Sequence, residues 1–118
     1  MKTYAITRNE DNTVSATVEN GTEARPLTHV KYHSDGFELG YSGSGPADLA
    51  LSILAEHLGE QVTGGTLRRV PIGDDAPRCW QLHHRFKSYF LSPQHLDKGE
   101  TWTLDDAEIS AWIGEQPR

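Results

Sequence analysis

The chain has 118 residues, 36% of them hydrophobic, and its formal net charge is −6 at pH 7. This length and apolar content predict a single domain, residues 1–118, with a core of modest size. A mean hydropathy of −0.60 without a long apolar run excludes a membrane-spanning protein, and the single cysteine excludes an internal disulfide framework.

The start of the chain, MKTYAITRNE, contains no apolar segment of the kind that a secretory signal peptide needs. A single cysteine also fits a reducing compartment better than an oxidising one. We therefore expect the protein in the cytoplasm, with no membrane contact.

The first 41 residues alternate between apolar and polar side chains, which is the period of a half-buried strand. Two turn signals, Asn20-Gly21 and Asp35-Gly36, separate these alternating runs and are typical of tight hairpins. The pattern predicts an antiparallel N-terminal meander with one buried face. We expect its strands at residues 2–8, 13–19, 27–33 and 37–41.

The next segment predicts a glycine-rich elbow followed by a helix over residues 46–58. Gly43-Ser44-Gly45 offers backbone freedom for positive φ, and Pro46 suits the first helical position. Gly59 predicts the helix end. On a helical wheel the apolar residues form one arc, and we expect the opposite, exposed face to carry Asp48, Ser52, Ala55 and Glu56.

The rest of the chain predicts one short strand and two more helices. Glycine and proline punctuate residues 59–78, with a short strand at 66–72. A helix over residues 77–91 would bury a stripe made by Leu82, Phe86, Tyr89 and Phe90. Thr103, with an acid three residues on, predicts the N-cap of a last helix. The fold class is thus α+β, an antiparallel N-terminal meander with three helices packed on one face.

The run FELGYSGSGPADLALSIL resembles the signature of a small, functionally uncharacterised family found in phage, prophage and plasmid genes. The Phe86-Lys87 helix and the TLDDAEISAWI ending are also similar to that family. That family more often has Trp at the position of Leu39 and Gly at the position of Ser42. The resemblance implies a mobile element, whose short accessory genes often encode inhibitors of host defence such as anti-CRISPR proteins. It brings no catalytic residue with it.

Two groups of residues suggest small-ligand chemistry as an alternative. Amides at Gly43, Ser44 and Gly45 could hold an anion at a helix N-terminus, although Asp48 places a negative charge there. His57, Cys79 and His83 would form a zinc site with only three protein ligands, or a Cys–His nucleophile pair, if their helices pack together. Partly buried His and Cys are also ordinary core-edge residues, so we expect no metal and no cofactor.

The charged residues favour a protein partner. The net charge is −5 over residues 1–60, +3 over 61–96 and −4 over 97–118. An acidic chain disfavours direct nucleic-acid binding, while arginine beside tryptophan is typical of protein hot spots. We therefore expect a non-enzymatic protein that occupies the surface of a host protein, such as a nucleic-acid-binding one. The predicted contact residues are Trp80, Arg85, Glu100, Glu108 and Glu115.

Overall fold

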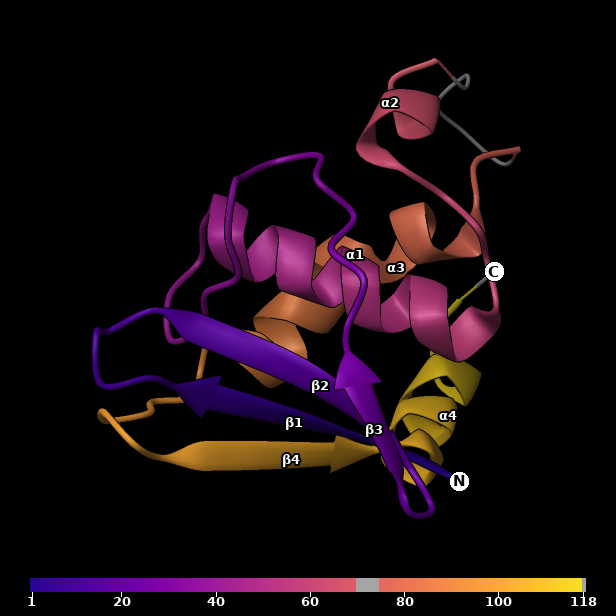
Figure 1. The fold of residues 1–118 in the computed structure, drawn as a ribbon. Helices are drawn as coiled ribbons and strands as arrows, with labels where there is room; N and C mark the ends of the chain where they lie inside the picture. The colour runs from indigo at the N-terminus through magenta and orange to yellow at the C-terminus, as the bar shows by residue number, and fades with distance from the viewer. Residues whose placement is uncertain (70–74, 118) are drawn as a thin grey trace.

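The computed structural model describes residues 1–69 and 75–117, and over these residues it has an α+β fold. A four-stranded antiparallel sheet has the order β3-β2-β1-β4, with the helices gathered on one of its faces (Figure 1). The strands are β1 (Lys2–Arg8), β2 (Val14–Asn20), β3 (Glu23–Pro26) and β4 (Thr101–Asp105). The helical segments are α1 (Ser44–Leu58), α2 (Gly64–Leu67), α3 (Arg78–Phe86), the π-helix η1 (Lys87–Leu91) and α4 (Asp106–Gly114).

Of the two predicted hairpins, the one at Asn20-Gly21 forms, whereas no strands flank Asp35-Gly36. β1 pairs with β2 along its whole length, and Gly21, with φ of 67°, turns the chain from β2 into β3. Tyr4 lies opposite Val18, so both side chains point from neighbouring strands into the core. The period-two pattern of β1 and β2 therefore identifies the buried face correctly.

The strands predicted at 27–33 and 37–41 are wrong. These residues form an irregular connection that crosses α1, and within it a single bridge joins Phe37 to Val14. Leu27 and Val30 are buried, and the Val30 N–H donates to the Ser52 hydroxyl of α1. Side chains of α1 thus accept backbone hydrogen bonds that a neighbouring strand would have accepted.

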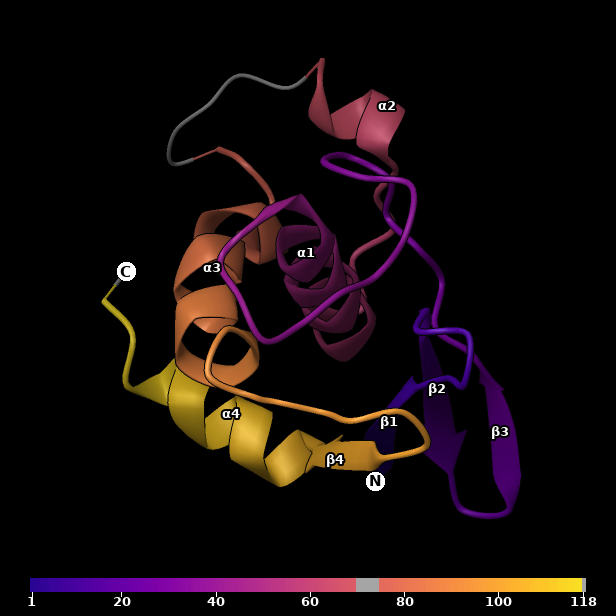
Figure 2. The same ribbon diagram turned by 90° about the vertical axis from the view of Figure 1, so that its left-hand side faces the viewer.

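The fourth strand comes from the other end of the chain. β4 pairs antiparallel with β1, so the first strand lies in the middle of the sheet and β4 forms an edge. β4 leads directly into α4, which continues toward α3 on the helical side of the sheet (Figure 2). The predicted N-cap at Thr103 is wrong by two residues, because Thr103 lies in β4 and Asp105 caps the helix.

Helix α1 occupies the centre of the molecule. It packs between the sheet and α3, and every residue from Gly45 to Ala55 is buried. The expected exposed face is wrong for Asp48, Ser52 and Ala55, because the irregular connection covers that side of the helix. A helix covered on every side need not be amphipathic. Its end at Leu58, followed by Gly59, is as predicted.

The helix predicted over residues 77–91 is present as α3 and η1, but its buried stripe changes direction. Leu82 and Phe86 are fully buried, as predicted, whereas Tyr89 is 64% exposed. In η1 the Ser92 N–H donates to the Lys87 carbonyl five residues earlier, at 2.9 Å. This wider turn rotates the following side chains, so Leu91 reaches the core and Tyr89 does not.

The short strand predicted at 66–72 is wrong over its first residues. They belong to the short helix α2, which begins after Thr63 with a capping box made with Thr66. Residues 70–72 of that prediction lie outside the described residues. Among the helices that the structure describes, none has the length and apolar character needed to cross a membrane.

Candidate functional site

The glycine elbow before α1 is set by close packing. Gly43 is extended, with φ of −163°, so the expected positive φ is wrong here; the positive φ in this stretch belongs to Gly40, at 89°. A side chain at Gly43 would collide with the ring of Tyr41, and one at Gly45 would come within 2.6 Å of the Glu38 Cβ. Glycine is therefore needed at position 45, where Glu38 lies against the backbone, whereas at position 43 the exposed Tyr41 ring could move aside.

Asp48 organises the connection that crosses α1. Its carboxylate is fully buried and accepts the backbone N–H groups of Tyr32, His33 and Ser34 at 3.3, 2.8 and 3.0 Å. The Ser34 hydroxyl and the His29 ring also bond to it, at 3.2 and 2.8 Å. One buried charge thus fixes three consecutive residues by charge-assisted hydrogen bonds.

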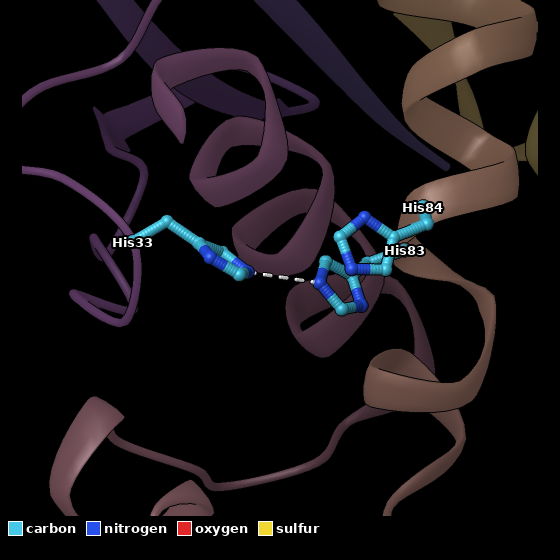
Figure 3. A group of neighbouring side chains, drawn as sticks. All are labelled: His33, His83 and His84. Carbon is cyan, nitrogen blue, oxygen red and sulfur yellow. Dashed lines mark hydrogen bonds between the residues drawn. The ribbon is translucent and has the colours of Figure 1, made fainter. Parts of the chain in front are cut away.

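The fixed connection places His33 against α3. Its Nε2 lies 3.1 Å from Nε2 of His83, and His84 lies beside them (Figure 3). One ring nitrogen from each of these three histidines lies within 4.8 Å of the other two. His83 is fully buried, His33 is half-buried and His84 is exposed. We call this group the histidine cluster.

The rings around the histidine cluster make one wall of it aromatic. Trp80 stacks on His33 with an interplanar angle of 8°, and Tyr32 meets His33 edge-on. Trp80, which the sequence suggested as a partner contact, is only partly exposed and packs against the core. This wall keeps the His33 ring turned toward α3.

All three histidines of the cluster favour the neutral form. Burial lowers the pKa of His83 to about 4, although the bond to the Trp80 carbonyl opposes this shift. Burial also lowers the pKa of His33 and of His84, and the positive charge of Lys87 adds to both shifts. Each ring therefore has one N–H group and one nitrogen with a lone pair.

The sequence did not identify this cluster. His33 falls in the strand predicted at 27–33, and His84 falls in the helix predicted over residues 77–91. The adjacent pair His83-His84 was a usable signal, but nothing local indicates that His33, fifty residues earlier, faces it. That juxtaposition depends on Asp48, whose role cannot be read from a helical wheel.

The histidine cluster does not include His57 and Cys79, the other two members of the predicted metal trio. Nδ1 of His57 lies 3.0 Å from the Asp106 carboxylate, and its Nε2 lies 3.1 Å from the Ser110 hydroxyl, both on α4. Cys79 is fully buried beside Glu60, and burial together with that carboxylate raises its pKa to about 12. A protonated, buried thiol is a poor nucleophile.

A second candidate site is a shallow hollow between the α3–η1 segment and α4. Its volume is about 560 Å³. Tyr89 stands at its side, with its ring centroid 6.3 Å from that of Trp112. We call it the Tyr89 hollow, and its lining residues are His84, Arg85, Ser88, Tyr89, Trp112, Glu115 and Gln116.

Of the predicted contact residues, Arg85 and Glu115 line the Tyr89 hollow. Glu108 is exposed but belongs to the helix cap, because its backbone N–H donates to Asp105 at 2.9 Å and its carboxylate faces the Asp105 N–H. The Glu100 carboxylate accepts the Asp97 N–H at 2.6 Å, in the turn before β4. Two of the five predicted contacts are therefore brought together at one surface.

Comparison with known proteins identifies a family. A family model described as a family of unknown function, DUF6166, matches residues 4–69, which is more than half of the chain. The matched segment runs from within β1 to just after α2, includes Asp48 and His33, and ends before α3. Searches of curated proteins and of solved structures gave no match.

Proposed function

The chain belongs to the DUF6166 family of unknown function, and we propose that it is a non-enzymatic binding protein that occupies the surface of a partner through the Tyr89 hollow. The partner that we propose is a basic host protein, such as one that binds nucleic acid. The resemblance of the elbow sequence to phage and plasmid genes supports a mobile element as the source. An inhibitor of host defence of the anti-CRISPR kind fits that setting.

The observation that carries this proposal is the exposure of Tyr89. Large aromatic side chains usually lie in the core, and this one stands 64% exposed beside a hollow that reaches Trp112. Exposed aromatic residues next to a hollow are typical anchors of protein interfaces. Tyr89 also lies in a π-helix, a rare structure that is frequent at functional positions.

Charge supports a basic partner. Residues 97–118 carry a net charge of −4, and the end of α4 with the two residues after it forms one wall of the Tyr89 hollow. Glu115 stands at the edge of the hollow beside Gln116, which Arg85 contacts at 3.5 Å. A partner that presents an apolar side chain next to Lys or Arg would match this surface. Complementary charge would speed the encounter, while the aromatic anchor would hold the complex.

The experiment compares capture of one partner by wild-type protein and by variants of the hollow. Wild-type protein and Tyr89→Ser serve as baits in a host lysate, and the protein that wild type retains is identified, purified and titrated. We expect Tyr89→Ser to weaken binding about 30-fold or more, the usual effect of losing an aromatic anchor. We expect Glu115→Lys to slow association and to reduce its salt dependence.

Tyr41→Ser is the matched control, because Tyr41 is 50% exposed but lines a different hollow. It should bind like wild type. Glu108→Lys is unsuitable as a charge probe, because it would also remove the carboxylate that faces the Asp105 N–H in the cap of α4. A partner that binds Tyr89→Ser and wild type with equal affinity would show that the contact surface lies elsewhere.

A further inference from the structure

The histidine cluster has the geometry of an incomplete metal centre. Tetrahedral zinc with bond lengths of 2.0–2.1 Å keeps its nitrogen ligands about 3.3 Å apart. The Nε2 atoms of His33 and His83 are 3.1 Å apart, and all three ligand nitrogens lie within 4.8 Å of one another. His84 is exposed, so its ring can turn toward the other two at low cost.

We propose that His33, His83 and His84 bind one divalent transition-metal ion of the zinc class, with a fourth position left open for water or a small anion. Imidazole suits zinc and its neighbours in the first transition row. Three protein ligands with an open position are typical of reactive zinc sites, whereas structural sites use four.

The hydrogen bonding of His83 prepares it as a ligand. Its Nδ1 lies 2.6 Å from the Trp80 carbonyl, and a carbonyl can only accept, so the proton must be on Nδ1. The lone pair is therefore on Nε2, the atom that faces His33. A histidine ligand that donates its other N–H to a backbone carbonyl is the usual arrangement around protein-bound metals.

The remaining supports hold the two sides of the site in place. Asp48 fixes the His33 backbone with a 2.8 Å hydrogen bond, and helix α3 fixes His83. Metal binding would replace the hydrogen bond in which His33 Nε2 donates to His83 Nε2, with the His33 proton moving to its Nδ1.

The test measures zinc binding by full-length protein prepared with a tag that contains no histidine. Titration against a coloured zinc chelator should give one high-affinity site per chain. His33→Gln keeps a hydrogen-bond donor toward His83 but supplies a poor zinc ligand, and we expect at least a tenfold loss of affinity. His84→Ala should show a similar loss, and because His84 is exposed, this variant should fold.

His95→Ala is the control, since His95 is 83% exposed and pairs with Asp97 in a separate turn. It should bind zinc like wild type. Less than a tenth of an equivalent of zinc per chain would overturn the proposal, as would equal affinity in wild type, His33→Gln and His84→Ala. His33 does not line the Tyr89 hollow, so His33→Gln leaves the proposed partner surface intact.

Cobalt(II) tests the open position. In place of zinc it should give the intense visible absorption of a four-coordinate site, and adding azide should change that spectrum. A spectrum that azide does not alter would show that the fourth position is closed, and would overturn this part of the proposal. Loss of the spectrum in His33→Gln would assign it to the histidine cluster.

Discussion

The side chain of Asp48 accepts backbone hydrogen bonds that a neighbouring strand would otherwise accept. Three consecutive backbone N–H groups, from Tyr32 to Ser34, donate to its buried carboxylate. Without it the half-buried N–H groups of His33 and Ser34 would lose their acceptor, which costs about 1–3 kcal/mol for each group, whereas the Tyr32 N–H would keep its 3.1 Å bond to the Val30 carbonyl. The irregular connection is therefore held by one charge, and the position of His33 depends on that charge.

Asp48→Asn should destabilise the fold by about 2–4 kcal/mol. The amide keeps the shape but has one acceptor oxygen, and its NH2 group would face backbone donors. Urea unfolding followed by tryptophan fluorescence gives the difference. Asp97→Asn, in an exposed turn, is the control and should change stability by less than about 0.5 kcal/mol. Equal stability of the two variants would contradict the central role of Asp48.

Glu56 should make the protein sensitive to acid. Burial alone would raise its pKa, but hydrogen bonds and ion pairs with Lys2 and Arg25 outweigh burial and hold the pKa below its usual value of 4.5. Because the folded pKa is lowered, this stabilisation is complete above pH 4.5 and is lost as the pH falls below it.

Glu56→Gln should therefore lose about 1–2 kcal/mol at pH 7 and show a smaller further loss than wild type on acidification. Unfolding free energies measured at pH 7 and at about pH 3 would show whether the difference between the two proteins shrinks. Glu19→Gln, on the exposed side of β2, should follow the wild-type curve. If the unfolding free energies of wild type and Glu56→Gln differed by the same amount at both pH values, Glu56 would act through packing.

At the scale of elements, α2 is held against the connection that carries His33. Gly64 lies so close to the Lys31 carbonyl that any side chain would clash with it, whereas a methyl group at Gly65 would meet only Thr63 Oγ1, at 3.7 Å. Alanine at Gly64 therefore tests the effect of packing, and alanine at Gly65 tests the effect of helix propensity alone. The contact also joins α2 to the backbone two residues before His33.

Gly64→Ala should destabilise the protein by about 1–3 kcal/mol, the usual cost of overpacking. Gly65→Ala should be neutral or should stabilise by up to about 1 kcal/mol, because alanine favours the helix. Thermal unfolding of both variants measures the contrast directly. Similar melting temperatures would show that α2 can move away from Lys31 without cost.

Elements with local signals could be predicted from the sequence, and elements that depend on distant residues could not. The β1–β2 hairpin, the end of α1 at Gly59 and the extent of the α3–η1 segment follow from turn residues and periodicity. β4 could not be predicted, because its pairing with β1 joins residues about one hundred positions apart. The same holds for the site, since Arg85 and Glu115 were identified but the contact of His33 with His83 was not.

In the whole molecule, the sheet is completed by β4, the strand that comes last in the sequence. β1 has β2 on one side and β4 on the other, and the Lys2 N–H donates to Asp106 at the start of α4. Without β4, β1 would be an exposed edge, and the core side chains of α4, Ile109 and Trp112, would be missing. The segment matched by the family model therefore leaves out part of the sheet and part of the core.

A chain shortened to residues 1–96 should lack a cooperative unfolding transition, because it loses β4 and α4 together. Circular dichroism during heating would show a broad, gradual change in place of a sigmoid. Removing only residues 117 and 118 is the control and should leave the transition near that of the full chain. A sharp transition in the 1–96 protein would show that the first three strands and the helices from α1 to η1 suffice to fold.

The position of β4 also has a consequence for synthesis. A ribosome adding about 5–20 residues per second makes β1 roughly 5–20 seconds before it finishes β4. During that interval β1 has hydrogen-bonding groups on one side with no strand to receive them, and neighbouring nascent chains present the same edge. The final structure can therefore form only after translation has passed residue 105, so expression yield should depend on how well the emerging chain is shielded until then.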